Sequence, residues 1–421
     1  MSPTEQQRPF SKVVIVGAGP SGMLLAILLA QQGIPSVILE AWDRLDERLR
    51  ATQYGVPATR IFHRAGIVDD IRAVSIPSFP NITWRRGADH EKLVSIDLSV
   101  VKDHPDRMTI LALNQILIIL YRHCTERFKD LIEIKFSHRV TGVGQDKAKA
   151  WVDVDVGEAE PKGKARFEAD YVIGCDGATS AVRKALFGRN WPGQTFNCRL
   201  VVQNVYYDGF EKHGWDGGNY MVDPEHWGLV AKRANEGLWR VTYGEDETLT
   251  DEQCLERRPA HLKALLPGNP DPGAYRIEKT NIYRTHNRCA ETFRVGRVLL
   301  AADAAHICNP WGGYGCMTAC VDVGGLADCL IGYHQGKAPE SILDLYSEIR
   351  REKFLKYVDV RSIKNMDRIS KTDPFTVLET DKFMRLLADL EGDDEKTRAF
   401  LLVSTYSLNI FLFPLHGDLC H

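Results

Sequence analysis

The sequence of 421 residues lacks the features that would assign it to several common classes of protein. It has no surplus of positive charge, because 53 Lys and Arg residues stand against 56 Asp and Glu residues, and this balance argues against nonspecific binding to nucleic acid. It also has no C-x-x-C pair, so we predict neither a disulfide framework nor a metal site. The ten cysteines are scattered over positions 124, 175, 198, 254, 289, 308, 316, 320, 329 and 420.

Long hydrophobic runs are also missing. The run Leu24–Ala30 is far shorter than the roughly 20 residues that cross a bilayer, and the apolar stretch Phe400–Leu415 is interrupted by polar residues and Pro414. The first residues lack the charged-then-apolar order of a signal peptide. We therefore predict no membrane span and a cytoplasmic protein. With 44% hydrophobic residues the chain can bury a sizeable core, and its length predicts two or three lobes.

A glycine motif lies near the N-terminus, between a predicted strand over 12–16 and a predicted helix over 23–32. It reads Gly17-Ala18-Gly19-Pro20-Ser21-Gly22, which fits G-x-G-x-x-G in the required strand–turn–helix context. Gly17 permits the tight turn, Gly19 lets the backbone approach a pyrophosphate, and Gly22 lets the helix pack on the strand. The helix N-terminus, with Ser21 in its first turn, offers N–H groups and partial positive charge to phosphates.

Glu40 ends the second predicted strand, 36–39, and stands 23 residues after Gly17. An acidic side chain at this place bonds ribose hydroxyls and repels a 2′-phosphate. Together with the glycines it predicts a site for the ADP part of a dinucleotide. The motif leaves FAD and NAD as alternatives.

The order of predicted elements indicates that this nucleotide-binding fold is interrupted twice by β-rich material. A hairpin is predicted near 82–98, and long antiparallel strands fill 198–245 before a last buried strand at 297–301. The boundaries predict a discontinuous nucleotide-binding domain of residues 1–75, 99–185 and 281–365. Residues 76–98 and 186–280 would form a β-rich substrate domain, and 366–421 a helical C-terminal segment. We expect a small-molecule site in the cleft between the two domains.

Two further motifs follow the first. Residues 174–183 read GCDGATSAVR, and residues 297–306 read RVLLAADAAH, followed by PWGGYGCM over 310–317. In this order and spacing the three motifs resemble the FAD-dependent monooxygenases of the p-hydroxybenzoate hydroxylase type (class A), over about residues 10 to 365. The run Val321–Leu326 is similar to fungal members of secondary metabolism. The resemblance implies an α/β fold with a discontinuous Rossmann-like FAD-binding domain, an inserted antiparallel β-sheet substrate domain and a helical C-terminal region.

The resemblance also implies roles for single residues toward FAD. Asp303 would bond a ribityl hydroxyl, and Asp176 would support the pyrophosphate and the passage of the nicotinamide cofactor. The loop before Met317 would lie along the flavin ring, and the helix that follows would direct its N-terminus at the ring, where it would stabilise the reduced, anionic flavin. Ala302 departs from the family pattern, which usually has Gly there. The predicted cofactor-binding residues are Gly17, Gly19, Ser21, Gly22, Glu40, Arg50, Gln115, Asp176, Asp303, Pro310, Gly313, Gly315, Cys316 and Met317.

The implied reaction uses NADPH or NADH and O2 to hydroxylate an aromatic, phenolic or polyketide-derived molecule through a flavin C4a-hydroperoxide. Substrate contacts are expected from the β-rich domain, where Tyr220, His226 and Tyr243 are candidates to hold a phenolate or act as base. His306 is interpreted as structural. The sequence leaves several alternative functions: an epoxidase, a Baeyer–Villiger-type oxygenase or a reductase on the same scaffold, and a non-catalytic FAD-binding protein. The sequence predicts no oligomeric state.

Overall fold

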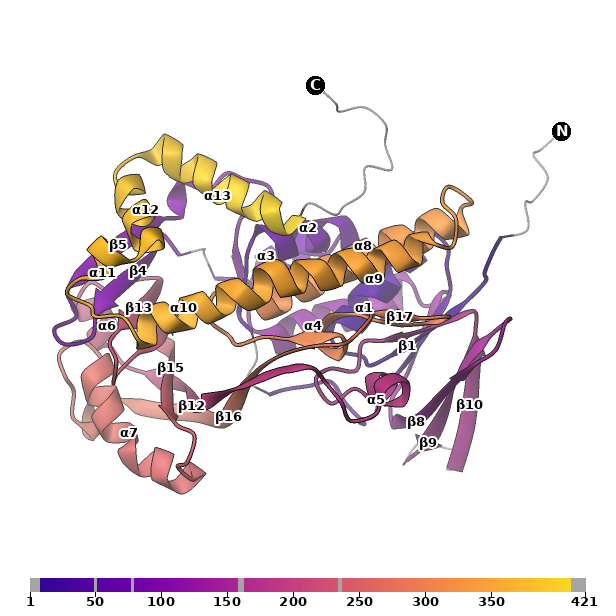
Figure 1. Ribbon diagram of the computed structural model, residues 1–421, viewed down its shortest axis with the longest axis horizontal. Helices are drawn as coiled ribbons and strands as arrows, with labels where there is room; N and C mark the ends of the chain where they lie inside the picture. Colours follow the sequence, from indigo (N-terminus) through magenta and orange to yellow (C-terminus); the bar gives the residue numbers. More distant parts are fainter. Residues whose placement is uncertain (1–7, 49–50, 77–78, 158–162, 234–236, 410–421) are drawn as a thin grey trace.

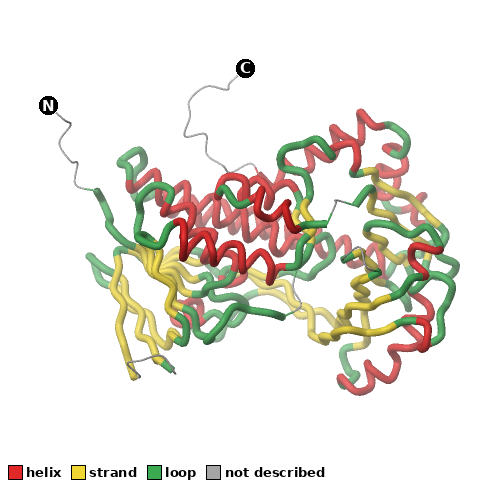
Figure 2. Tube along the Cα trace, turned by 180° about the vertical axis from the view of Figure 1, so that it is seen from behind, coloured by secondary structure: helices red, strands yellow, loops and turns green. Residues whose placement is uncertain are grey.

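The computed structural model describes residues 8–48, 51–76, 79–157, 163–233 and 237–409, with side chains up to residue 402. Two lobes lie side by side and long helices run along both (Figure 1). Seen from behind, one lobe is a sheet with helices against it, and the other is built mostly of strands with helices at its outer edge (Figure 2). Each lobe is centred on its own sheet.

The first lobe is built on a six-stranded sheet in the order β17-β18-β11-β1-β2-β7. β1 pairs in parallel with β2 and β11, and β11 with β18, while β17 joins the edge in the antiparallel direction. Helix α1 (Pro20–Ala30) crosses from β1 to β2, and its residues 22–30 are all buried. This is the βαβ unit expected from the first glycine motif. The strands are β1 (Val13–Val16), β2 (Ser36–Leu39), β7 (Ile132–Lys135), β11 (Tyr171–Gly174), β17 (Arg294–Val295) and β18 (Val298–Leu300).

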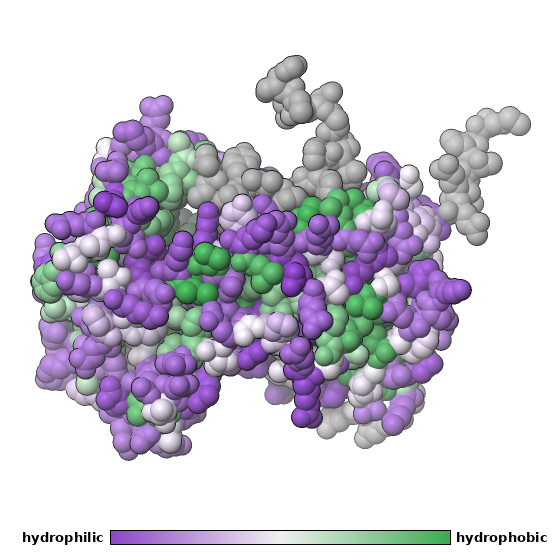
Figure 3. All heavy atoms as spheres, viewed as in Figure 1, coloured by the Kyte–Doolittle hydropathy of each residue, from purple (hydrophilic) through white to green (hydrophobic). Residues whose placement is uncertain are grey.

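Helix α8 (Tyr314–His334) is the central helix of this lobe and packs against α1, α2 (Val56–Ala65) and α9 (Ile342–Lys353). Among the described residues it is the single helix long and apolar enough to span a membrane, yet 72% of that stretch is buried inside the protein. The surface in Figure 3 is mostly hydrophilic, with hydrophobic side chains in separate patches. We therefore assign α8 to the protein core.

The second lobe is built on an eight-stranded sheet in the order β19-β16-β12-β15-β14-β13-β4-β5. The β4–β5 hairpin comes early in the chain, yet it joins this sheet because β4 pairs in parallel with β13. β16 continues through residue 281, where the sequence places a domain boundary. The strands are β4 (Asn81–Arg86), β5 (Lys92–Asp97), β12 (Gly193–Tyr206), β13 (Gly218–Val222), β14 (Gly228–Lys232), β15 (Leu238–Asp246), β16 (Arg276–Cys289) and β19 (His306–Ile307).

Smaller elements connect and cover the two sheets. A three-stranded sheet of β8 (His138–Gln145), β9 (Ala150–Val156) and β10 (Gly163–Ala169) flanks the first lobe, and β3 (Gln53–Tyr54) pairs with β6 (Thr109–Ile110). The remaining helices are α3 (Val68–Val74), α4 (Leu113–Arg122), α5 (Ala181–Phe187), α6 (Gly209–Lys212), α7 (Asp251–Leu265), α10 (Val360–Ser370), α11 (Val377–Thr380), α12 (Lys382–Leu390) and α13 (Asp394–Asn409).

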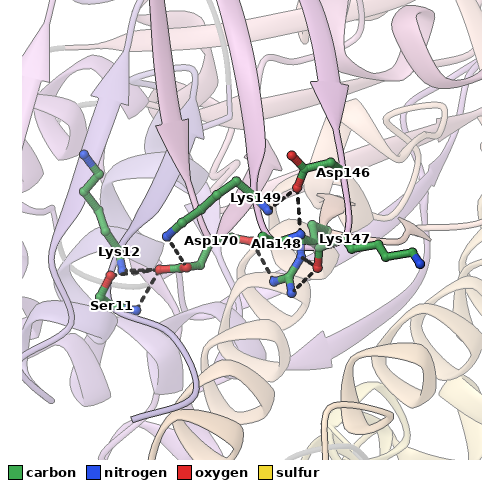
Figure 4. Close-up of polar contacts among 8 residues, drawn as sticks. Ser11, Lys12, Asp146, Lys147, Ala148, Lys149 and Asp170 are labelled. Carbon is green, nitrogen blue, oxygen red and sulfur yellow. Dashed lines mark hydrogen bonds and ion pairs between the residues drawn. The ribbon is translucent and has the colours of Figure 1, made fainter. Parts of the chain in front are cut away.

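Asp170, just before β11, holds the start of the parallel sheet together (Figure 4). One carboxylate oxygen accepts bonds from the backbone N–H groups of Ser11 and Lys12 at 2.7 and 3.1 Å, and the other lies 2.6 Å from the Lys149 ammonium. Burial opposes ionisation, but these donors outweigh it and lower the pKa of Asp170 to about 2. The contacts fix where β1 starts relative to β11.

A buried ionic network joins α8 to the turn after β18. The Asp322 carboxylate lies 2.6 Å from Nε2 of His306 and 2.6 Å from Nε of Arg350, and it accepts a 3.3 Å bond from the backbone N–H of Ala302. Its burial raises the pKa, but the contacts with His306 and Arg350 outweigh this effect, so the pKa of Asp322 is lowered. His306 is thus a buried partner of Asp322, which agrees with its interpretation as a structural residue.

Replacement of Asp322 tests this network. We expect Asp322→Asn to lower the free energy of unfolding by about 3 kcal/mol, because it leaves Arg350 buried without its carboxylate. Urea denaturation at neutral pH measures the change. Since the folded-state pKa of Asp322 is lowered, its contribution is present above the pKa of the unfolded carboxyl and disappears as pH falls through the folded value.

The matched control is Asp328→Asn on the same helix. Asp328 pairs with Arg64 but keeps 16% of its side chain exposed, so we expect a loss of about 1 kcal/mol or less. Equal losses in the two variants would contradict a special role for the buried network.

Candidate cofactor and substrate site

The first glycine loop is shaped by close backbone contacts on one side and open space on the other. Gly17 has φ +104°, and a Cβ there would lie 2.6 Å from the carbonyl oxygen of Cys175, at the end of β11. A Cβ on Gly22 would overlap the carbonyl oxygen of Gly17. At Gly19, by contrast, a Cβ would meet no atom within 4 Å. The loop therefore leaves space above Gly19, where the motif predicts a pyrophosphate.

The α1 N-terminus and Glu40 face this space. Helix α1 begins at Pro20 and has no side-chain cap, so the first-turn N–H groups, including that of Ser21, are not used by a capping side chain. Glu40 accepts bonds from the backbone N–H of Ala18 at 2.8 Å and of Trp42 at 3.0 Å. Its carboxylate is thereby held at the end of β2, beside the glycine loop.

Asp176 follows β11, and its contacts within the structure are with the helix that comes next. Its carboxylate accepts bonds from the Ser180 hydroxyl at 2.5 Å and from the Ala181 and Val182 backbone N–H groups at 2.6 and 3.2 Å. Burial outweighs these donors and raises the pKa of Asp176. Arg183 closes the same turn by donating to the carbonyls of Ala178 and Ala304 at 2.7 and 2.9 Å. The second and third motifs are thus tied together directly.

The third motif delivers Asp303 on a one-turn 3-10 helix, Ala302–Ala304, just after β18. Asp303 is exposed, whereas its neighbours Ala302 and Ala304 are buried. Ala302 has φ +58°, in the left-handed region that favours glycine. The alanine that departs from the family pattern therefore occupies a strained backbone position.

The glycine-rich loop after Pro310 leads into α8. Gly312 and Gly313 have φ +104° and +66°, and Gly313 is the N-cap of the helix. A Cβ on Gly315 would meet no atom within 4 Å, so the first turn of α8 also borders open space. Met317, in that turn, lies against Gly55 at the start of α2, because a Cβ on Gly55 would be 2.8 Å from its sulfur.

The other predicted cofactor residues lie in the loop and first turn of α8, on α4 and near residue 50 of the chain. Cys316 lies in the same first turn, and its nearness helps to raise the pKa of Cys320 one turn later. Pro310 is half-buried in the loop. Gln115 lies on α4 with an exposed side chain. Arg50 lies outside the described residues.

The three candidates for catalysis do not lie together. The ring of Tyr220 stacks on Trp84 at 5.3 Å, and Tyr220 packs against the buried cluster that contains Trp311 of the loop before α8. Tyr243 instead stacks on His261 of α7 at 4.4 Å, and Nδ1 of His226 lies 3.3 Å from Nδ1 of His261. The large sheet thus directs Tyr220 toward the flavin-side loop, while Tyr243 and His226 belong to a cluster around α7.

Residues that no motif identified also border the site. Tyr54 is fully buried and immediately precedes Gly55. The pKa of Tyr54 is raised, mainly by burial and further by Cys316 and Cys320, and the cations Arg233 and Arg240 oppose this rise. Nothing in the local sequence distinguishes these three side chains, because they come from elements that are remote from one another in the chain.

A cavity of about 410 Å³ opens at the junction of the two lobes. Gly55, Tyr314 and Met317 line it on the α8 side, and its walls are largely apolar. Its basic side chains are Lys102, Arg107 and Arg361. The remaining lining residues are Val56, Pro57, Phe79, Pro80, Leu98, Ser99, Val101, Met108, Leu401 and Leu402.

The comparison with protein families agrees with this geometry. A model described as "FAD binding domain" matches residues 11–360. The chain belongs to this FAD-binding family. The match covers both lobes.

Relatives of known activity make the assignment more specific. The chain is 36% identical over 392 residues to para-nitrophenol 4-monooxygenase of a Pseudomonas strain, covering 93% of this chain and 94% of that protein. It is 34% identical over 366 residues to 6-hydroxy-3-succinoylpyridine 3-monooxygenase of Pseudomonas putida, covering 86% and 90%. The chain is therefore an FAD-dependent aromatic monooxygenase of class A. The likeness to fungal secondary metabolism is not shown by these bacterial relatives and stays a prediction.

Solved structures give the same result. The crystal structure of p-nitrophenol 4-monooxygenase PnpA from Pseudomonas putida superposes with a TM-score of 0.84 at 34% identity, over 95% of this chain and 99% of that one. The flavin-dependent monooxygenase PieE, in complex with FAD and substrate, superposes with a TM-score of 0.73 at 19% identity, over 95% and 72%, which shows the shared fold alone.

The residues present fit FAD. Open space lies above Gly19 and Gly315, at two helix N-termini that favour negative charge, and the close contacts of Gly17 and Gly22 keep side chains out of the loop. When bound, FAD supplies hydride acceptance from NAD(P)H and the activation of O2. The chain supplies binding, orientation and exclusion of water.

Substitution at Gly19 tests the pyrophosphate position. We expect Gly19→Val to raise the dissociation constant of FAD by about 10- to 100-fold, because its side chain fills the space above the α1 N-terminus. Quenching of flavin fluorescence on titration of apoprotein measures it. Thermal stability without FAD should stay near wild type, whereas Gly22→Ala should lower it by crowding Gly17. Unchanged FAD affinity in Gly19→Val would rule out this position.

The strain at Ala302 gives a second test. We expect Ala302→Gly to raise the free energy of unfolding by about 0.5 kcal/mol, since relief of a left-handed alanine exceeds the entropy that glycine adds to the unfolded chain. Denaturant titration checks the sign. Ala304→Gly, in the same turn but without positive φ, should instead lose about 1 kcal/mol. A loss in both variants would show that the turn is not strained at Ala302.

Proposed function

We propose that this monooxygenase hydroxylates a small phenol bound between the large sheet and the loop that precedes α8. The supporting observation is that Trp311 of this loop packs in one buried cluster with Trp84 and Val202 of the sheet, and Tyr220 packs against that cluster. This packing brings the face of the sheet that carries Tyr220, called the inner face below, against the loop before α8, where the flavin ring is predicted to lie. The similarity to para-nitrophenol 4-monooxygenase supports a phenol of one ring.

The inner face suits a flat aromatic ring. Cross-strand pairing places Tyr220, Leu229, Thr242 and Val202 in one row, because Tyr220 faces Leu229, Leu229 faces Thr242, and Thr242 faces Val202. Trp84 extends this row on the other side of Tyr220. The row is apolar apart from two hydroxyl groups, so it can exclude water while offering few hydrogen bonds.

We assign Tyr220 the role of a neutral hydrogen-bonding group. Burial raises its pKa to about 12, and Tyr314 adds to this effect, while the backbone of Gly312 and the charge of Arg368 oppose it. At neutral pH the phenol of Tyr220 therefore keeps its proton. It can position the loop or the substrate, but it does not serve as the base.

We further propose a cytoplasmic location. The nine cysteines among the described residues are all free thiols, as expected of a protein kept in a reducing compartment. This argument supports the location independently of the reaction.

The reaction is tested with purified holoenzyme. We expect para-nitrophenol to stimulate NADPH or NADH oxidation several-fold, and the product to carry one atom from isotopically labelled O2, measured by mass spectrometry. Stimulated oxidation that yields only hydrogen peroxide with every simple phenol would refute a phenol as the substrate. Incorporation beside a carbonyl or across a double bond would favour the Baeyer–Villiger or epoxidase alternative.

Tyr220 is tested in the same assay. We expect Tyr220→Phe to raise the share of NAD(P)H lost as peroxide and to lower kcat/KM by about tenfold, because it removes the hydroxyl group that we propose positions the loop or the substrate. Tyr275→Phe is the matched control, since Tyr275 packs in the separate cluster beside α7. Equal behaviour of the two variants would contradict the role of Tyr220.

A further inference from the structure

The cavity at the junction of the two lobes is lined by positive charge alone. Its basic side chains are Lys102, Arg107 and Arg361, and no aspartate or glutamate of the described residues lines it. The whole chain, by contrast, has a formal net charge of −3. A concave site with one sign of charge concentrates ligands of the opposite sign. The cavity is therefore suited to an anionic ligand.

The three cations come from segments that are remote from one another in the chain. Lys102 directly follows a one-turn 3-10 helix, Ser99–Val101, and Arg107 lies two residues before β6. Arg361 lies on α10, in the last part of the chain. Lys102 is exposed, whereas Arg107 and Arg361 are half-buried. The fold thus gathers the charges around one opening, although no sequence motif contains them.

In the part of the chain that the structure describes, no carboxylate forms an ion pair with any of these three cations. Asp106, the neighbour of Arg107 in sequence, lies 3.1 Å from Nε of Arg60 instead. The guanidinium of Arg361 lies 5.6 Å from the ring centre of Tyr357, a contact that leaves its charge without a counter-ion. The cavity can therefore accept several negative charges from a ligand.

One wall of the cavity belongs to the predicted flavin side. Gly55, Tyr314 and Met317 line it, and the last two lie in the first turn of α8. Tyr220 and Trp84, beside which the phenol is proposed to bind, are not among the lining residues. The cavity therefore reaches the predicted flavin side separately from the proposed place of the phenol.

These properties match the nicotinamide dinucleotide that reduces FAD in this class of enzyme. The ligand has a flat, uncharged dihydronicotinamide ring at one end and several negative charges on its phosphates. Transfer of a hydride needs the ring within about 3.5 Å of the flavin, whereas the phosphates can stay near the opening. The volume of about 410 Å³ lies low in the range of small-molecule pockets, roughly 300–1,000 Å³, so we expect it to take the nicotinamide end only.

We propose that this cavity binds NADPH or NADH, with the dihydronicotinamide ring between its apolar walls and the phosphates at Lys102, Arg107 and Arg361. A hydride with its two electrons passes from C4 of the ring to FAD, and NADP+ or NAD+ is released. Arginine and lysine hold phosphates by charge-assisted hydrogen bonds. The inference goes beyond the proposed function, because it concerns the co-substrate and applies to any aromatic substrate.

The charges are tested on holoenzyme by binding and by kinetics. Isothermal titration calorimetry gives the dissociation constants of NADP+ and NAD+, and the dinucleotide that wild type binds more tightly is used further. We expect Arg107→Gln and Arg361→Gln each to raise this dissociation constant, and the KM for the reduced form, by about tenfold. The kcat should change by less than about twofold, because the lost contacts are remote from the reacting atoms. Arg107→Lys should recover part of the affinity.

Two further variants separate the space of the cavity from the charge of the protein. Ser99 lines the cavity and is exposed, so Ser99→Trp should obstruct the opening and raise the same KM without a change of charge. Lys263→Gln is the matched control for charge, since Lys263 lies on α7 outside the cavity and pairs with Asp271 at 3.0 Å. It should keep the wild-type constants. FAD content is measured for every variant.

Four outcomes would overturn the proposal. The two arginine variants could leave the constants for the dinucleotide unchanged, or Lys263→Gln could change them as much. The arginine variants could instead lose FAD, which would assign the cavity to the flavin. They could also weaken only the binding of para-nitrophenol, which would make the cavity the route of the aromatic substrate. The proposed function is judged separately, by labelled oxygen in the product.

Discussion

The site depends on the close approach of two strand ends. The backbone at Gly17 lies against the carbonyl of Cys175, at a distance that no side chain on Gly17 would permit. This contact places the first glycine loop beside the Asp176 turn, and Arg183 then ties that turn to the carbonyl of Ala304. Through these contacts three segments that are remote in the chain come together at one edge of the sheet. The parallel pairing of β1, β11 and β18 sets their common edge.

The two lobes contribute different things to catalysis. The first lobe provides backbone: glycine loops, helix N-termini and few charged side chains, an arrangement that suits a large anionic cofactor. The second provides a sheet whose inner face carries the stacked rings of Tyr220 and Trp84, beside which we propose that the substrate binds. Because strands alternate, the opposite face is free to build a core with α7, where Tyr243 is completely buried. One sheet thereby serves both binding and stability.

The sequence predicted the parts that local pattern determines. The glycine loop, Glu40 and the order of elements follow from short-range rules, and the resemblance correctly indicated an FAD-dependent aromatic monooxygenase. The face on which Tyr220, Tyr243 and His226 lie could not be predicted, since a shift of one residue in register reverses every side chain in a strand. Tyr54 was missed because only the tertiary structure brings it near α8. The left-handed φ of Ala302, whose backbone N–H donates to the buried Asp322, is likewise a property of the folded chain.

The early position of the β4–β5 hairpin has a consequence for how the protein is made. The hairpin is synthesised long before β13, its parallel partner. In the same way, β11 is synthesised long before β18, with which it also pairs in parallel. Neither sheet can be completed until most of the polypeptide has been synthesised, so the nascent chain exposes unpaired strand edges in the meantime. Because the two sheets are interleaved along the chain in this way, a single cut cannot give two fragments that each contain one complete sheet.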